Sequence, residues 1–299
     1  MKKQPPLHFG VITLMPEMFQ ALNYGIVGRA LKTELATVNY WNPREWATDV
    51  HKTVDDKPYG GGPGMVMMYQ PLALAIECAK RSLPPNCKTV YLSPQGKKIE
   101  QYHLNAIVEN RQHVLFVAGR YEGIDERIID RYIDEEWSVG DFVISGGELA
   151  AMTLMDGIIR LIPGALGHQA SNVQESFMHG LLDYPHYTRP DTIYTQQSSF
   201  RQGPNNRDES VYMQDMTQKT LAPAEAREAC NTEEKITEQS IDEMPVPAVL
   251  LSGDHQAIER WRRKQSLGKT WLKRPELLNN LDLSELDKQL LDEFKTLKE

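Results

Sequence analysis

Three short segments rich in glycine and polar residues could form a pocket for a nucleoside-like cofactor. Each follows an apolar run of strand length, and they cover residues 92–96, 119–123 and 138–147. Parallel sheets bind ligands at the carboxyl ends of their strands, where exposed backbone N–H and C=O groups can hydrogen-bond an adenine or a ribose. One glycine at a strand end often only terminates the strand. Three such loops along one edge predict a nucleoside pocket.

The densest glycine cluster lies earlier, in residues 57–65 (KPYGGGPGM). Its spacing matches neither a dinucleotide-binding fingerprint nor a phosphate-binding loop. Glycines in such a run can serve tight turns alone. The preceding segment 51–56 (HKTVDD) places hydrogen-bonding side chains beside a backbone that another molecule can approach closely. This neighbourhood favours a ligand role.

The elements that must position these loops fit one α/β domain over roughly the first 165 residues, a doubly covered sheet of βα units. Apolar runs without alternation predict strands buried on both faces of a parallel sheet, at 9–14, 89–92, 114–118 and 142–144. Helical spacing lies between and after them, at 70–82, 101–110, 123–133 and 148–161.

Residues 192–244 differ in composition from the rest of the chain. Residues 191–243 contain eleven acidic and five basic side chains, a net charge of −6, with few long apolar runs. We predict a partly disordered surface insertion with a helix near 222–230. After it, Ser252 or Asp254 could cap a helix running to about residue 266, and the chain from 272 onward is predicted to be helical.

The composition limits the class of protein. The 299 residues are 40% hydrophobic and 25% charged, which suggests about two globular domains. No stretch of about 18 apolar residues and no signal-peptide core occurs, so we expect a soluble cytoplasmic protein with no membrane partner. The three cysteines are too few and too scattered for a disulfide framework or a zinc site.

The net charge of −8 argues at first sight against a nucleic-acid partner, which requires clustered Lys and Arg. The distribution of the charge changes this expectation. Residues 256–274 contain seven basic side chains and one acidic side chain. A solvated helix face is the commonest explanation of such a run taken alone.

Five longer motifs carry a resemblance to a known family. They are HKTVDD (51–56), PYGGGPGM (58–65), YLSPQG (91–96), GRYEGIDER (119–127) and PHYTRP (185–190). Together they resemble the bacterial tRNA (guanine-N1)-methyltransferases that act at tRNA position 37, the TrmD family of the SPOUT class. The similarity covers nearly the whole chain except 192–244. Several long motifs in the same order are far more specific than any short pattern.

The resemblance implies a homodimer whose sheet domain, 1–166, contains a deep trefoil knot. A linker, 167–174, would lead to a smaller, mainly helical tRNA-binding domain, 175–299, that contains the polar acidic insertion. General folding rules would exclude a knot, so this expectation comes from the family alone. The knot loops would bind S-adenosylmethionine through Tyr91, Leu92, Ser93, Pro94, Gln95, Gly119, Tyr121, Glu122, Gly123, Ser138, Val139, Gly140, Asp141, Phe142, Val143, Ile144, Gly146 and Gly147.

Methylation of guanine N1 requires a base, because this nitrogen carries a proton, and stabilisation of charge on O6. The family uses an aspartate in an Asp-Ser-Phe context, where this chain has Glu175-Ser176-Phe177. The resemblance therefore implies Glu175 as base and Arg160 as the O6 ligand. Glutamate has a similar pKa, about 4.3 against 3.9, but its extra methylene moves the carboxylate by roughly an ångström. The plainer alternatives are a solvated glutamate and an arginine that favours the helix dipole.

The resemblance also implies residues that contact tRNA or shape its site: Arg29, His51, Asp55, Gly64, Asp183 and, on the basic helix, Arg260 and Arg263. Trp261 and Trp271 interleave with the basic residues, which favours phosphate binding over a solvated face. The family's activity is associated with Mg²⁺, whose site the sequence does not reveal. Two alternatives stay open: a related knotted ribose 2′-O-methyltransferase, and an RNA-binding homologue without catalytic activity, because residue 175 is Glu rather than Asp.

Overall fold

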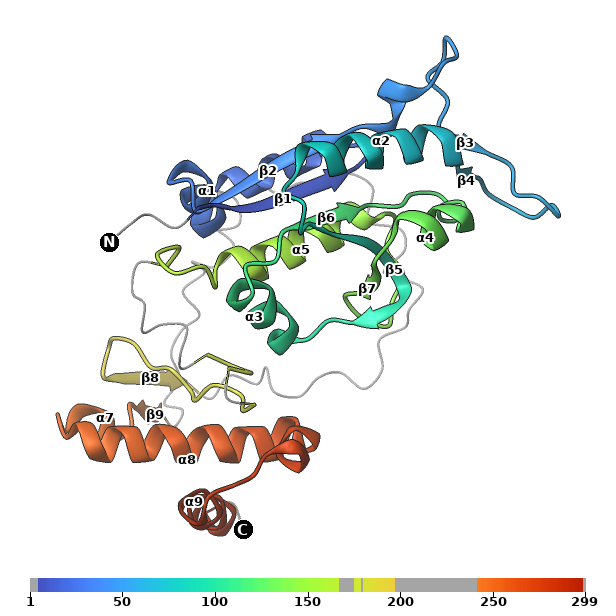
Figure 1. The fold of residues 1–299 in the computed structure, drawn as a ribbon. Coiled ribbons are helices and arrows are strands. Elements are labelled where there is room, and N and C mark those ends of the chain that lie inside the picture. Colours follow the sequence, from blue (N-terminus) through green and yellow to red (C-terminus); the bar gives the residue numbers. More distant parts are fainter. Residues whose placement is uncertain (1–4, 167–174, 179, 197–240, 298–299) are drawn as a thin grey trace. The chain divides into compact units, whose positions relative to one another are not determined.

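A computed structural model of the chain describes residues 5–166, 175–178, 180–196 and 241–297 (Figure 1). The chain divides into two compact units, which we call unit 1 (1–183 with 274–281) and unit 2 (184–273 with 282–299). The predicted linker at 167–174, the predicted helix near 222–230 and most of the predicted insertion lie outside the described residues.

Unit 1 is built on a five-stranded sheet in the order β2-β1-β6-β5-β7 (Figure 1). All neighbouring strands in it are parallel, which confirms the predicted parallel sheet. The strands are β1 (Leu7–Ile12), β2 (Ala36–Trp41), β5 (Lys88–Lys98), β6 (Val114–Val117) and β7 (Glu135–Ser138). A separate antiparallel pair joins β3 (Asp55–Asp56) to β4 (Val66–Met67).

Apolar side chains cover both faces of this sheet, as the continuous apolar runs predict. Val114 and Phe116 of β6 belong to one buried cluster, and Leu115 and Val117 belong to the other, because successive side chains of a strand point to opposite faces. The first cluster packs against η1 (Pro16–Asn23), α1 (Gly25–Lys32), α3 (Gln101–Glu109) and α5 (Gly147–Ile159). The second packs against η2 (Pro43–Trp46), α2 (Tyr69–Ser82) and α4 (Glu126–Tyr132).

The predicted strand at 142–144 is wrong. Phe142 and Val143 lie in the loop before α5 and are 58% and 86% exposed. The last strand is instead β7, whose Trp137 is only 3% exposed. The sequence does not predict β7, because the strand begins with two glutamates. The apolar run at 142–144 suggests a strand, but it is short and lies between glycines. The edge strand β2 was also not predicted, because only its first residue is buried.

Unit 2 contains a two-stranded antiparallel ribbon, β8 (Thr192–Gln196) with β9 (Ile241–Pro245). The ribbon is followed by α7 (Ala248–Leu251), α8 (His255–Lys273) and α9 (Glu285–Thr296), while η6 (Pro275–Asn280) belongs to unit 1. The Asp254 side chain accepts hydrogen bonds from the first backbone N–H groups of α8, as its predicted capping role requires. In the described part of the chain, no helix is both long and apolar enough to cross a membrane.

Candidate cofactor pocket and catalytic pair

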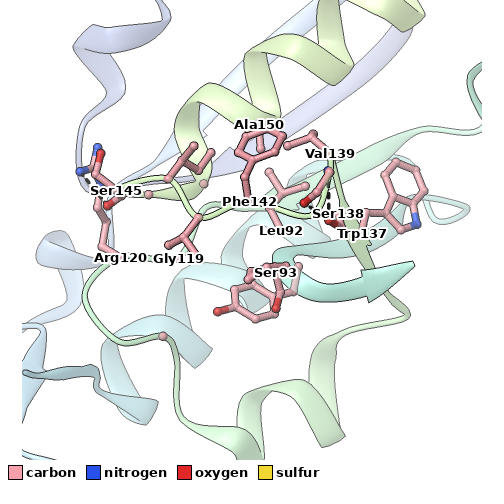
Figure 2. Close-up of a pocket in the computed structure, with 18 of the residues that line it drawn as sticks. Leu92, Ser93, Gly119, Arg120, Trp137, Ser138, Val139, Phe142, Ser145 and Ala150 are labelled. Carbon is pink, nitrogen blue, oxygen red and sulfur yellow. Dashed lines mark hydrogen bonds between the residues drawn. The ribbon is translucent and has the colours of Figure 1, made fainter. Parts of the chain in front are cut away.

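A cavity of about 210 Å³ lies beside the middle of β5, where the pairing of β5 with β7 shifts register between Leu92 and Lys97, and beyond the ends of β6 and β7 (Figure 2). Residues of all three segments predicted from the sequence line it, but 92–96 lies inside β5, at an irregularity in its pairing with β7, and not in a loop after the strand. The wall consists of residues 91–94, 119–123, 137–140, 142–147 and Ala150. Arg120 with Ser145 and Trp137 lie at opposite ends of the group of side chains shown in Figure 2.

Glycines allow the backbone segments of the wall to approach one another closely. A Cβ atom on Gly119 would lie 2.8 Å from the ring of Tyr91, and one on Gly147 would lie 2.7 Å from the Cα of Ala118. Both distances are too short for any side chain. The peptide groups of these loops thus form part of the wall, and burial raises the pKa of Tyr91, which keeps its hydroxyl protonated.

A buried ion pair joins three segments around the pocket. The guanidinium Nε of Arg120 lies 2.9 Å from Oε2 of Glu148, which is fully buried in the first turn of α5. The other carboxylate oxygen of Glu148 accepts a hydrogen bond of 2.9 Å from the hydroxyl of Thr13, directly after β1. Arg120 also donates to the carbonyl oxygen of Ser145 at 3.3 Å (Figure 2). The pair thus connects β1, the 119–123 loop and the 139–147 loop.

Four wall residues were not in the predicted set: Arg120, Trp137, Ser145 and Ala150. The signal that could have identified the ion pair is Glu148, a carboxylate at the start of an otherwise mainly apolar helix.

Two predicted cofactor residues, Gln95 and Asp141, are absent from the described wall of the pocket. The backbone N–H of Gln95 donates to the hydroxyl of Ser93, and the carboxylate of Asp141 lies 3.5 Å from the ammonium group of Lys98 at the surface.

The end of the glycine-rich loop is attached to the 119–123 loop. The backbone N–H of Glu122 donates to the carbonyl of Met65 at 2.9 Å, and a Cβ atom on Gly64 would lie only 2.3 Å from Oε1 of Glu122. Asp55 hydrogen-bonds Tyr121, whose pKa is raised first by burial and then by this contact. The structure therefore joins predicted substrate residues to predicted cofactor residues.

Arg160 and Glu175, the two residues predicted for catalysis, form a two-pronged ion pair within unit 1. The Nη1–Oε2 and Nη2–Oε1 distances are both 2.6 Å. Both side chains are partly buried, and the hydrogen bonds that Arg160 donates to Glu175 raise the pKa of Arg160. Arg160 directly follows the last residue of α5, so this helix connects the pair to the pocket wall at its other end.

The remaining predicted tRNA residues have varied surroundings. Arg29 donates to the carbonyl of Gly164 at 3.1 Å, and the N–H of Asp183 donates to the hydroxyl of Ser176 at 3.0 Å. His51 lies in an exposed turn, where its backbone N–H donates to the carboxylate of Asp49.

On α8, the two arginines predicted to contact tRNA are held by carboxylates of α9. The guanidinium of Arg260 lies 2.6 Å from the carboxylate of Glu293, and that of Arg263 lies 2.7 Å from the carboxylate of Asp287.

Comparison with known proteins gives a consistent result. The family model of tRNA (Guanine-1)-methyltransferase TrmD matches residues 7–200 and 232–280. A tRNA (guanine-N(1)-)-methyltransferase of Legionella pneumophila (strain Lens) is 54% identical over 97% of this chain and 96% of its own length. One from Coxiella burnetii (strain Dugway 5J108-111) is 50% identical over 96% and 97%. The family match covers most of the chain and omits only the middle of the predicted insertion and the ends. This chain belongs to the tRNA (guanine-1)-methyltransferase family.

Proposed function

We propose that this protein transfers the methyl group of S-adenosylmethionine to N1 of the guanine at tRNA position 37. The observation that carries this proposal is the Arg160–Glu175 pair at one end of a helix whose other end lines a strand-end pocket, in a member of this family. When bound, S-adenosylmethionine supplies a methyl group on a positively charged sulfur, which leaves as a neutral thioether.

The pocket wall suits such a cofactor. Peptide groups of the 91–94, 119–123 and 139–147 segments can hydrogen-bond an adenine and a ribose, and Trp137 and Phe142 supply apolar surface. The carboxylate of Glu122 lies in the same wall and would attract the positively charged methionine end.

Glu175 and Arg160 handle the proton and the charge of the guanine. Glu175 accepts the proton from N1 of the base, which leaves N1 with the electron pair that bonds to the methyl carbon. Arg160 donates hydrogen bonds to O6, where negative charge builds up as that proton leaves. The carboxylate of Glu175 ends as a carboxylic acid and returns the proton to solvent.

We propose a knotted sheet domain, a helical tRNA-binding domain, a homodimer and action in the cytoplasm, where tRNA is modified. The described residues include no group of three or more His, Cys, Asp or Glu side chains placed to hold a metal ion.

Methyl transfer to defined tRNA transcripts tests the proposal. Purified protein is incubated with cofactor labelled in the methyl group and a transcript carrying guanines at positions 36 and 37, and the digested product is separated into nucleosides. We expect label in 1-methylguanosine, and none when position 37 is adenosine. Label in a ribose-methylated nucleoside would identify the 2′-O-methyltransferase alternative. Tight tRNA binding without any transfer would identify the inactive homologue.

A further inference from the structure

Unit 2 contains a second cavity, of about 420 Å³, which we call the aromatic cavity. It lies between the segment 184–191, the segment 246–251 that includes α7, and the face of α8 that contains Ile258, Trp261 and Arg262. Its wall includes Tyr184, Tyr187, Asp191, Ile258, Trp261 and Arg262. The wall contains four aromatic rings, those of Tyr184, His186, Tyr187 and Trp261, and two arginines.

The rings of the aromatic cavity are arranged at angles to one another. The ring centroids of Tyr187 and Trp261 lie 6.3 Å apart with planes inclined by 56°. Tyr187 is 49% exposed, so a large part of its side chain is open to a ligand. Such rings are platforms on which an unpaired nucleobase can stack, whichever base it is.

The cation of the aromatic cavity is Arg262. Its guanidinium carbon lies 4.8 Å from the centroid of the Tyr184 ring. Among the residues that the structure describes, its buried Nε atom has no hydrogen-bond partner, and no carboxylate forms an ion pair with it. This desolvated N–H lacks an acceptor, and Arg262 itself lines the aromatic cavity.

The neighbouring cations of α8 differ from Arg262 in this respect. Arg260 and Lys264 lie 2.6 and 3.5 Å from the carboxylate of Glu293, and Arg263 lies 2.7 Å from that of Asp287. These three side chains pair with two carboxylates of α9. Ile258, Trp261 and Arg262 have the i, i+3, i+4 spacing of a shared helix face, and all three line the aromatic cavity.

We propose that the aromatic cavity binds one unpaired nucleobase of the tRNA anticodon loop, with the base stacked on Tyr187 and Trp261 and with Arg262 donating to it. This inference rests on the proposed function, which brings an anticodon loop to the protein. A nucleobase is favoured over an apolar peptide side chain because arginines and tyrosine hydroxyls surround the rings, and the Asp191 carboxylate on the wall can accept hydrogen bonds from a base edge. The cavity would increase the affinity for tRNA and fix the position of the anticodon loop on the protein, without taking part in methyl transfer.

The test is a cycle that combines protein variants with base deletions. Wild-type protein, Tyr187→Ala and Tyr187→Phe are titrated with the intact transcript and with transcripts that each lack one base of the anticodon loop. Tyr194→Ala is the matched control, because Tyr194 is an exposed tyrosine of unit 2 outside the aromatic cavity.

We expect wild-type affinity to fall about 5- to 150-fold for one of the base deletions, the range of base–aromatic stacking. Tyr187→Ala should lose a similar factor on the intact transcript and nothing further on that one deletion. Tyr187→Phe and Tyr194→Ala should bind like wild type. The inference would be overturned if the affinity losses caused by Tyr187→Ala and by a base deletion multiplied for every deletion. It would also be overturned if Tyr194→Ala lost as much affinity as Tyr187→Ala.

Two further measurements separate the possible failures. If Tyr187→Ala lowers the thermal unfolding midpoint, Tyr187→Leu keeps apolar packing while removing the ring, and the same loss is expected. Methyl transfer by wild-type protein is measured on the intact transcript in parallel. If methyl transfer to position 37 occurs but the losses from Tyr187→Ala and the base deletions all multiply, only the proposed role of the aromatic cavity is refuted. If no transcript is methylated, the proposed function itself is refuted.

Discussion

The guanidinium of Arg160 and the carboxylate of Glu175 hold each other through two hydrogen bonds of 2.6 Å. Both oxygens of the proposed base are therefore engaged by the proposed O6 ligand when no guanine is present. The Watson–Crick edge of guanine offers an acceptor, O6, beside a donor, N1–H. A guanine can thus replace each half of the ion pair with a hydrogen bond of the same polarity.

Glu175→Gln should lower kcat at least about 100-fold, because an amide cannot accept the N1 proton and general base catalysis contributes on that order. Glu175→Asp should retain more activity, since it keeps the carboxylate at a shorter reach. Single-turnover methylation at saturating tRNA measures both. Unchanged turnover in Glu175→Gln would rule out this residue as the base.

Arg160→Lys should lower kcat by about 10- to 100-fold, because lysine cannot form the two parallel hydrogen bonds of a guanidinium. The informative comparison is the double variant with Glu175→Gln. Residues that act as one unit lose activity non-additively, so the double variant should be little slower than the slower single variant. Fully multiplicative losses would show that the two residues act independently.

Gly64→Ala should raise the KM for S-adenosylmethionine, because the new Cβ would lie 2.3 Å from Oε1 of Glu122 in the pocket wall. Gly60→Ala is a matched control. Both glycines have positive φ, +79° at Gly64 and +86° at Gly60, but no atom lies within 4 Å of a Cβ at Gly60. Backbone strain is common to both variants, so only displacement of Glu122 should separate their cofactor titrations. Equal KM values for Gly64→Ala and Gly60→Ala would show that the close approach of Gly64 to Glu122 does not affect cofactor binding.

Glu148→Gln should destabilise the protein by about 3 kcal/mol, because it leaves the charge of Arg120 without its buried partner. Cofactor binding should also weaken, since Arg120 lies in the pocket wall. Thr13→Val removes only the hydrogen bond to Glu148 and should cost about 1 kcal/mol. Urea unfolding and cofactor titration measure the two effects. A Glu148→Gln protein as stable as Thr13→Val would contradict the importance of the ion pair.

Asp287→Asn should reduce the loss in the free energy of unfolding that occurs as the pH falls. The hydrogen bond from Arg263 lowers the pKa of Asp287 in the folded protein, against an opposing effect of burial. Its stabilising contribution is therefore present above the unfolded-state pKa of about 3.9 and is lost as the pH falls through the lower folded value. Urea unfolding between pH 3 and 6 compares wild type with the variant, and the exposed Asp292→Asn serves as control. Parallel curves for wild type and Asp287→Asn would contradict the linkage.

From the sequence we predicted the parallel sheet, the helices α2, α3, α4 and α5, and three segments that line the pocket, but not α1 or the 3-10 helices before β5. Strands covered on both faces require continuous apolar runs, and helices require a regular apolar spacing, so both are visible locally. Strand-end loops of a parallel sheet then meet at one edge whatever their exact sequence. β7 was missed because its burial depends on the partner strand β5 rather than on its own composition.

Only the tertiary structure decided which charged side chains face one another. The spacing of α8 shows that Arg260 and Arg263 share a face, but not that the carboxylates of α9 occupy it while Arg262 faces an aromatic cavity. Likewise, Arg160 meets Glu175 and Arg120 meets Glu148 through contacts between separate segments. Periodicity fixes the direction of a side chain around its own helix, whereas its partner depends on how distant segments pack.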